Sequence, residues 1–465
     1  MRASIVLIFI FLFYGNAKAQ LVINEFMQSN IDCIVDDLNE FPDSWVELFN
    51  AGEEDINLDD FSLSIQDEME KAWILPDSLI SPKSFVVIFC DKVANGLHTD
   101  FRLDSGKGGA IILYKGSEIA DRIDNINKQP APNISYGRKF DGKDEWGYQY
   151  TSTPNQSNCG IICSSKKILP PPIFDKTGFI TTSNIPFELK MSVPEEAPKG
   201  AEIYYTLDGK EPTKSDIKYV NPINITSTTI IRAKLICDGY LSPRATTNSY
   251  IFFPRKITLP VISISTNEDY LYDSNLGILV EGGYSDNKEN YQYNWRRPVN
   301  LEFFRNEDSQ SQINQLCELR VMGGSYSRQR PIKPLAVYAH KRFGKKYFEY
   351  PFFPNDKPDV NIFKSFLLRN SGNDFYDLYM LDAIVQRSMG THADLDWQAW
   401  QPAVVFLNGN YSGIMNIRER SNEDNIYSNY NGLDNIDMVE NWTLLKEGSL
   451  DEYEKFRSFY NEEGQ

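Results

Sequence analysis

The sequence predicts a multidomain fold in which two N-terminal all-β sandwiches precede a mixed α+β domain. The chain has 465 residues, more than one hydrophobic core accommodates, so two to four domains are expected. Residues 21–155 contain short β-branched and aromatic runs separated by turn residues, and these runs show no helical period. From Tyr376 to Met389 apolar residues recur every three or four positions, which is typical of a helix. A second helical stretch is expected over 449–460.

The composition indicates globular domains and argues against one class of partner. Hydrophobic residues make up 41% of the chain and aromatic residues 13%, which is typical of folded proteins. The formal net charge is −17, whereas proteins that bind nucleic acids present a basic face to the phosphates. We therefore expect no nucleic-acid partner.

Residues 1–19 have the three parts of a secretory signal peptide. Arg2 supplies a positive charge, residues 5–14 are apolar, and Ala17-Lys18-Ala19 has the form of a cleavage site. The apolar run is too short to span a bilayer, and no later run reaches about 18 residues, so no transmembrane anchor is expected. The sequence therefore predicts a secreted, periplasmic or cell-surface protein.

Residues 20–158 form the first predicted sandwich. The expected strands are LVINEF, SWVELFN, FSLSI, SFVVIFC and AIILY. The order of WVELFNAG, DINLDDFSLS, WILPDSLISPKSFVVIF, HTDFRLDSGKGGAIILY and ISYGRKFDG resembles the lamin-tail domain. That family is an immunoglobulin-like sandwich, so the resemblance implies a binding or spacer role without catalysis.

Residues 159–172 are expected to be a linker, since three consecutive prolines favour an extended spacer. Whether Cys159 and Cys163 form a local disulfide is open, and no structural metal site is expected here. Residues 173–252 form the second predicted sandwich, in which AEIYYTLDGKEPT alternates as a strand and turns at Asp208-Gly209. Together with IIRAKLICDGYLSP, this run resembles the immunoglobulin-like C-terminal module of chitobiase and β-hexosaminidase. That module is an accessory domain, so no glycosidase activity is implied.

Residues 258–465 form the third predicted domain, in which two charged residues continue apolar strand faces. TLPVISISTNEDYLY and VNLEFF are expected to be strands. Lys333 is in phase with Leu335, and Glu419 is in phase with Ile417. A buried charge without a partner is costly, so each side chain needs an anionic or cationic neighbour. Kinases use a lysine and a glutamate in this way to position nucleotide phosphates.

The spacing leaves other interpretations of these residues open. Lys333 also fits a surface lysine at a strand end, and Glu419 fits a rim charge beside an arginine. Arg328 fits a turn residue. Asn408-Gly409 predicts a hairpin turn between two strands. The glycines of this region match neither a Walker nor a dinucleotide-binding loop.

The third domain also resembles a known family. GGSYSRQRPIKPLAV, KSFLLRNSGND and QPAVVFLNGNYSGIMNIRERSNED occur in the order found in the CotH kinase family. That family contains secreted or spore-coat atypical kinases that phosphorylate protein serine with ATP and a divalent metal. The resemblance therefore implies ATP and Mg²⁺, and nucleotide-binding roles for Lys333, Glu419 and, less directly, Arg328. It assigns no catalytic residue and no metal ligand in this chain.

The chain departs from the family at one point. The family's metal-binding aspartates, in an aspartate-x-aspartate context, follow the hairpin and the next helix, whereas this sequence stops at Gln465. Asp394-Leu395-Asp396 precedes the hairpin and is interpreted as a loop. We therefore expect an incomplete atypical-kinase-like domain. Two functions remain open. The first is an ATP-dependent kinase that acts on exported proteins. The second is a surface binding or adhesion protein, in which a non-catalytic kinase-like domain serves as scaffold and the ligand is a protein or a glycan.

Overall fold

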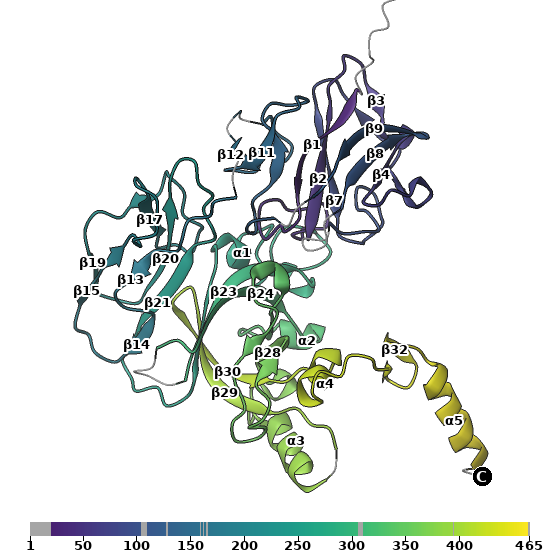
Figure 1. The fold of residues 1–465 in the computed structure, drawn as a ribbon. Coiled ribbons are helices and arrows are strands. Elements are labelled where there is room, and N and C mark those ends of the chain that lie inside the picture. Colours follow the sequence, from purple (N-terminus) through teal and green to yellow (C-terminus); the bar gives the residue numbers. More distant parts are fainter. Residues whose placement is uncertain are drawn as a thin grey trace, which may run out of the picture. The chain divides into compact units, whose positions relative to one another are not determined.

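A computed structural model describes residues 20–463, except for 104–108, 127–128, 159, 161, 164–165, 306–309 and 394. The predicted signal peptide lies outside the described residues, as do Cys159 and Asp394. None of the helices in the described ranges combines the length and the apolar character needed to cross a bilayer. The chain divides into two compact units (Figure 1). Unit 1 comprises residues 20–28, 43–129 and 134–164, and unit 2 comprises 29–42, 130–133 and 165–463.

Unit 1 is built from β-strands, as the sequence predicts. A six-stranded sheet has the order β12 (Ile162–Cys163), β11 (Trp146–Gln149), β10 (Tyr136–Arg138), β1 (Leu21–Met27), β2 (Ser44–Asn50) and β7 (Phe85–Cys90). A four-stranded sheet has the order β5 (Trp73–Ile74), β4 (Phe61–Ser64), β8 (Ile111–Lys115) and β9 (Glu118–Ile123), and β3 (Ile56–Asn57) pairs with β6 (Leu79–Ile80). Side chains from the two larger sheets share one core, which contains Ile23, Leu48, Leu63 and Leu113. The lamin-tail resemblance itself stays a prediction.

The first part of unit 2 is also all-β. A five-stranded sheet has the order β14 (Phe179–Thr181), β21 (Thr246–Phe252), β20 (Thr229–Ile236), β17 (Glu202–Thr206) and β18 (Ile217–Lys218). Two smaller sheets pair β13 (Ile173–Phe174) with β16 (Met191–Ser192), and β15 (Phe187–Leu189) with β19 (Ile223–Ile225). The predicted turn lies at the end of β17, where Gly209 has a φ of +80°. Leu189, Ile231 and Tyr250 lie in the core of this part.

The rest of unit 2 is organised around a closed β-barrel (Figure 1). Its order is β22 (Val261–Ser265), β23 (Arg296–Phe304), β24 (Ile313–Val321), β25 (Leu335–Tyr338), β28 (Ser365–Arg369), β30 (Asn410–Arg418) and β29 (Trp400–Leu407). Neighbouring strands are antiparallel except β22 and β29, which close the barrel in parallel. The short pairs β26 (Phe348–Glu349) with β27 (Ile362–Phe363), and β31 (Met438–Glu440) with β32 (Leu444–Glu447), lie outside the barrel.

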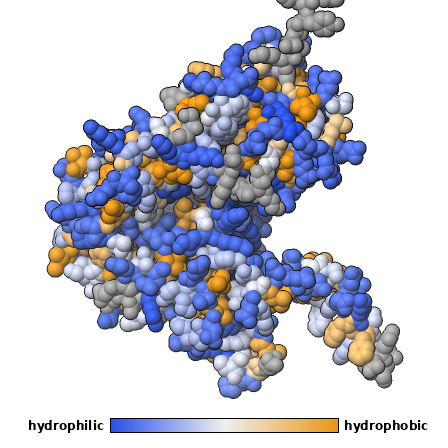
Figure 2. Space-filling view, viewed as in Figure 1, coloured by the Kyte–Doolittle hydropathy of each residue, from blue (hydrophilic) through white to orange (hydrophobic). Residues whose placement is uncertain are grey.

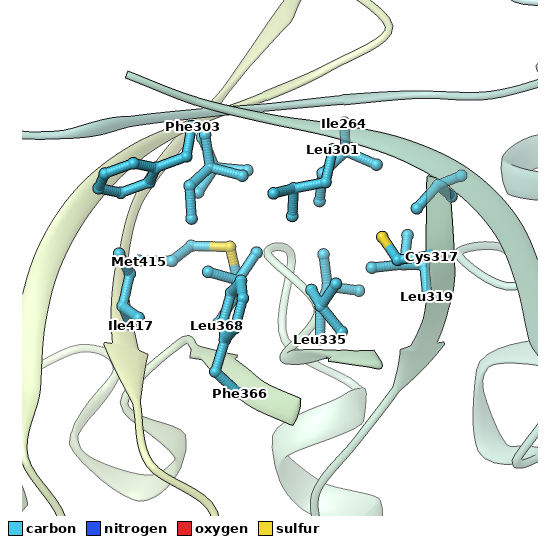
Figure 3. Close-up of a cluster of buried hydrophobic side chains, with 14 of the residues drawn as sticks. Ile264, Leu301, Phe303, Cys317, Leu319, Leu335, Phe366, Leu368, Met415 and Ile417 are labelled. Atoms are coloured by element: carbon cyan, nitrogen blue, oxygen red, sulfur yellow. The ribbon is translucent and has the colours of Figure 1, made fainter. Parts of the chain in front are cut away.

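Apolar side chains fill the barrel. Every other residue of these strands points inward, because successive side chains of a strand alternate between its two faces. Figure 3 shows side chains from opposite walls meeting in the interior, among them Leu301, Cys317, Leu335, Leu368 and Met415. The barrel is therefore a packed core with no room for a ligand among the side chains of Figure 3.

The predicted hairpin turn is confirmed. Asn408 and Gly409 connect β29 to β30 with φ values of +46° and +78°, as a two-residue hairpin loop of the favoured hand requires. The Asn408 side chain also accepts a hydrogen bond from the backbone N–H of Thr266 at 2.8 Å. This contact fixes the turn against the strand that closes the barrel.

The helices of unit 2 are α1 (Asp269–Tyr272), α2 (Ser325–Arg328), α3 (Leu381–His392), α4 (Glu423–Asn429) and α5 (Asp451–Glu463). Two predictions need correction here. The helix expected from Tyr376 begins at Leu381, because Tyr379 has a φ of +63° and Asp374 accepts the backbone N–H of Leu381 at 2.8 Å. The strand expected through TNEDYLY ends at Ser265, and α1 follows it. The predicted third domain combines the barrel with these five helices, and a kinase-like α+β arrangement is not confirmed. The C-terminal helix is confirmed as α5.

Several apolar side chains of α3 and α5 are exposed, including Val385, Met389, Phe456 and Phe459. The face of the molecule in Figure 2 is dominated by hydrophilic residues, with separate hydrophobic patches between them.

Candidate functional site

A cavity of about 780 Å³ lies beside the barrel at the glycine turn that follows β24. Its walls come from the Gly323-Gly324 turn, α2, the loop after β28 and the first turns of α3. We call it the glycine-turn cavity. It is lined by Met322, Tyr326, Ser327, Pro334, Leu335, Leu367, Leu368, Arg369, Asn370, Ser371, Gly372, Asn373, Asp374, Leu381, Asp382, Val385 and Gln386 besides the two glycines. Its volume is in the range of sites for small organic ligands.

The first glycine of the turn is required by the backbone. Gly323 has a φ of +104°, and a Cβ atom there would lie 2.6 Å from Oγ of Ser327. Gly324 has an ordinary φ of −70°, and a Cβ atom there would meet open space. The close approach therefore requires glycine at position 323 alone.

One carboxylate on the cavity wall binds two arginines. Oδ2 of Asp382 lies 3.1 Å from Nη2 of Arg369 and 3.3 Å from Nη1 of Arg418. Arg418 is fully buried, and burial lowers the pKa of its guanidinium. Its Nε and Nη2 have no hydrogen-bond partner among the described residues. Two cations thus share Oδ2 of Asp382, and the partly exposed guanidinium of Arg369 can also bind an anionic ligand.

Lys333 lies just before β25, one residue away from the cavity wall. Its Nζ donates a hydrogen bond to the carbonyl oxygen of Arg330 at 3.0 Å and lies 4.0 Å from the ring centroid of Tyr291. Burial lowers the pKa of Lys333. Two groups therefore act on the ammonium, namely the ring of Tyr291 and the charge of Glu281, which opposes the lowering of the pKa of Lys333.

The structure does not bring Lys333 and Glu419 together. Leu335 pairs with Leu368, and Leu368 pairs with Ile417, so Lys333 is level with Met415 on β30. Glu419 lies four residues further along, about 13 Å at the usual rise of a strand. The two side chains are at opposite ends of the barrel wall.

Glu419 has a different lysine as its partner. Nζ of Lys357 lies 2.6 Å from Oε2 of Glu419, and the two side chains are 15% and 1% exposed. The same carboxylate accepts the backbone N–H of Ala399 at 2.8 Å and Nδ2 of Asn429 at 2.7 Å. Lys357 also donates to the carbonyl oxygen of Trp397 at 2.9 Å. The phase of β30 correctly predicts that Glu419 is buried and paired, but its partner is not an arginine.

Arg328 is buried and holds a neighbouring loop. Its guanidinium donates to the carbonyl oxygens of Gly323, Gln292 and Tyr293 at 2.7, 2.9 and 2.9 Å. Nη2 also donates to the side chain of Asn294 at 2.9 Å. These bonds engage the guanidinium with the protein itself, so its observed role is to position the loop around residues 291–294.

A smaller cavity of about 300 Å³ lies on another side of α3. It shares Val385 and Gln386 with the glycine-turn cavity, and Trp397 and Gln398 line it as well. Trp397 also contacts Lys357, so this second cavity adjoins the Lys357–Glu419 pair. Helix α3 therefore separates two candidate binding spaces.

Two segments of the chain match known family models. Residues 319–456 match the CotH kinase protein model. The chain contains a CotH kinase domain. Residues 183–248 match the chitobiase/β-hexosaminidase C-terminal domain. A search of curated proteins finds no match to the chain. The CotH kinase domain includes both cavities and the Lys357–Glu419 pair.

The acidic residues that line the glycine-turn cavity do not fit a Mg²⁺ ion. Asp374 accepts the backbone N–H groups of Leu378 and Leu381 at 3.1 and 2.8 Å. Asp382 is held between two arginines, which oppose a second cation. Oδ1 of Asp382 has no hydrogen-bond partner among the described residues, but the two arginines on Oδ2 make this carboxylate a poor ligand for a second cation. Asp396 of the predicted loop accepts a hydrogen bond from Tyr430 at 2.6 Å.

Sequence reasoning missed three charged residues of the CotH kinase domain, namely Lys357, Arg369 and Asp382. Lys357 lies in a proline-rich turn segment, FFPNDKPDV, where no strand or helix phase indicates its direction. The sequence contains a signal for Arg369, because this arginine ends the apolar strand SFLLR directly before a polar loop, where a ligand can reach it.

Proposed function

We propose that residues 319–456 belong to an atypical protein kinase that transfers the γ-phosphate of ATP to protein serine. The observation that carries the proposal is the match of this segment to the CotH kinase model, over the residues that build the glycine-turn cavity. As the sequence analysis predicts, we infer that the protein is exported and that its substrates are exported or envelope proteins.

The glycine-turn cavity is the proposed nucleotide site. Apolar side chains such as Leu367 and Val385 suit the faces of a purine base. Arg369 suits a phosphate, because its fork-shaped guanidinium is 37% exposed and is oriented by Asp382. The backbone at Gly323, which carries no side chain, permits close approach of a ligand.

The residues predicted from the sequence enter this proposal in different ways. Lys333 contacts a phosphate if its ammonium turns away from Tyr291, which costs one cation–π contact and the hydrogen bond to Arg330. Glu419 acts through Lys357 and fixes the end of β30. Arg328 positions the loop around residues 291–294.

The proposed reaction is a phosphoryl transfer, in which no atom is oxidised or reduced. A serine hydroxyl oxygen of the substrate attacks the γ-phosphorus and forms the new O–P bond. The bond from the γ-phosphorus to the β,γ-bridging oxygen breaks, ADP leaves with that electron pair, and the hydroxyl proton passes to solvent. Mg²⁺ is not part of this scheme, because arginines engage Asp382 and backbone N–H groups engage Asp374.

Calorimetric titration of the full chain with ATP, with Mg²⁺ and with EDTA, tests the binding. We expect Arg369→Gln to weaken ATP binding about tenfold, because a charge-assisted contact is lost. Lys199→Gln removes an exposed charge from the chitobiase-like domain and is the control. ATP binding that is equal in Arg369→Gln and the unsubstituted chain would refute this placement.

One observation favours the second function, a binding or adhesion protein with a non-catalytic kinase-like domain. The cavity's two aspartates are engaged by backbone N–H groups and by arginines. Transfer of radiolabelled phosphate from ATP to the chain itself or to casein distinguishes the two functions. ATP binding without any transfer would support the scaffold, and transfer would support the kinase.

A further inference from the structure

A third cavity, of about 250 Å³, lies in unit 2 away from the two cavities of the CotH kinase domain. Glu211 and Arg232 of the chitobiase-like domain form one wall, and Tyr270 and Asn300 from the barrel region form another. Asp32, from the 29–42 segment that belongs to unit 2, also lines it. We call it the basic cavity.

Cations outnumber anions around the basic cavity. Oε2 of Glu211 lies 2.9 Å from Nη2 of Arg232 and 3.5 Å from Nε of Arg244, and its Oε1 lies 3.5 Å from Nζ of Lys234. Asp32 binds Arg244 through two hydrogen bonds of 2.7 and 2.9 Å. Three cations therefore share two carboxylates inside the protein.

The surplus charge is poorly solvated. The side chains of Arg232, Arg244 and Lys234 are 4%, 11% and 16% exposed. Burial lowers the pKa of Arg232 and of Lys234. Nε of Arg232 has no hydrogen-bond partner among the described residues. A further negative charge in the cavity would stabilise these cations.

A fourth cation stands at the rim. Lys210 lines the cavity with a side chain that is 52% exposed, and its nearest carboxylate, on Asp269, is 4.0 Å away. An ammonium in this position is free to move toward a ligand, because it gives up only a long surface ion pair.

Gly209, in the predicted turn, orients one arginine of the basic cavity. The carbonyl oxygen of Gly209 accepts Nη1 of Arg232 at 2.6 Å and so orients the guanidinium. A Cβ atom on Gly209 would lie 2.0 Å from the carbonyl oxygen of Thr266, so the turn packs directly on the barrel region. The arginine is held in place before any ligand arrives.

We propose that the basic cavity binds a small oxyanion, either a free phosphate or sulfate or the carboxylate of an acidic sugar. An oxyanion supplies the negative charge and the acceptor oxygens that the arginines and Lys210 lack. This site is separate from the proposed nucleotide site and does not depend on kinase activity.

The test is calorimetric titration of the full chain in a phosphate-free buffer at constant ionic strength. The probes are inorganic phosphate, sulfate and glucuronate, with glucose as the uncharged control. Lys210→Gln is expected to weaken anion binding about fivefold, since one partly exposed ion pair is lost. Because Lys210 is largely exposed, this variant is expected to fold. Lys199→Gln is the matched control on the same domain, and Arg369→Gln reports any binding in the glycine-turn cavity.

The outcomes separate clearly. Saturable binding of phosphate or sulfate that Lys210→Gln weakens assigns an inorganic oxyanion, and tighter binding of glucuronate assigns an acidic sugar. Either result supports the proposal. It is overturned if none of the three anions binds below about 10 mM. It is equally overturned if Arg369→Gln abolishes anion binding while Lys210→Gln leaves it unchanged.

Discussion

Lys357 and Glu419 form a buried ion pair, with Nζ 2.6 Å from Oε2, between a turn segment and the end of β30. Because Glu419 is 1% exposed, this lysine and the two N–H donors beside it take the place of water around the carboxylate. Removing one member of such a pair leaves an uncompensated charge in the interior, which costs more than the pair contributes.

We therefore expect Lys357→Met to lower the free energy of unfolding of the barrel by about 3 kcal/mol. The double variant Lys357→Met, Glu419→Leu should recover much of this loss, because no buried charge remains. Urea unfolding, followed by tryptophan fluorescence, measures the free energy of unfolding of the single and the double variant. Lys446→Met breaks an exposed pair with Glu440 and should change stability by about 0.5 kcal/mol or less. Equal effects of the two single substitutions would contradict the assignment.

The glycine turn provides a matched pair of substitutions. Gly323→Ala should destabilise the domain by about 1–2 kcal/mol and weaken ATP binding, since its φ is +104° and the new Cβ meets Ser327. Gly324→Ala should leave stability and ATP binding nearly unchanged, because its Cβ meets open space. Thermal unfolding with and without ATP tests this difference. Loss of ATP binding in Gly324→Ala alone would be inconsistent with the backbone geometry.

Arg328 should not be replaceable by lysine. Its guanidinium contacts three backbone carbonyl oxygens from two segments and an asparagine side chain, an arrangement that a single ammonium cannot reproduce. Arg328→Lys should therefore increase proteolytic cleavage around residues 285–294. Limited proteolysis with mass spectrometry measures it. A variant as resistant as the unsubstituted chain would show that Arg328 does not hold this loop.

The burial of Glu302 predicts that the stability of the folded protein depends on pH. It is fully buried beside Ser249, and burial raises its pKa from the ordinary 4.5 to about 7. The folded protein thus holds a proton that the unfolded chain releases, so this contribution is complete below pH 4.5 and is lost as pH rises through about 7. The difference amounts to about 3 kcal/mol.

We expect Glu302→Gln to remove this part of the pH dependence. Compared at pH 5 and pH 8, the variant should gain stability relative to the unsubstituted chain at the higher pH. Taking the difference between the two proteins cancels the other buried carboxylates, such as Glu40 and Glu47, whose pKa values are also raised by burial. A difference that is the same at both pH values would rule out a buried, protonated Glu302.

The strands and the hairpin were predictable because their signals are local. The alternation of FLNGNYSGIMNIRER sets the phase of Glu419, and Asn408-Gly409 admits the left-handed turn that the structure has. The partner of Glu419 was not predictable, since Lys357 is 62 residues away in sequence and lies in a segment without periodicity. Closure of the barrel brings such distant residues together. The pattern of a single strand contains no information about which residues will meet in this way.

The predicted start of α3 is wrong because the apolar spacing does not show which residue caps the helix. Leu378 continues the helical spacing of apolar residues, so the pattern alone includes it. In the structure Asp374 accepts the backbone N–H groups of Leu378 and Leu381, and Tyr379 adopts a positive φ. A side-chain cap thus competes with the helix for the same backbone donors.

The central claim is that the CotH kinase domain binds ATP in the glycine-turn cavity. Photolabelling of the full chain with 8-azido-ATP, with peptide mapping by mass spectrometry and competition by unlabelled ATP, tests it most directly. We predict competed labels within residues 322–335 or 367–386, which line this cavity. Labels confined to residues 395–425, beside the smaller cavity, or the absence of any competed label, would contradict the claim.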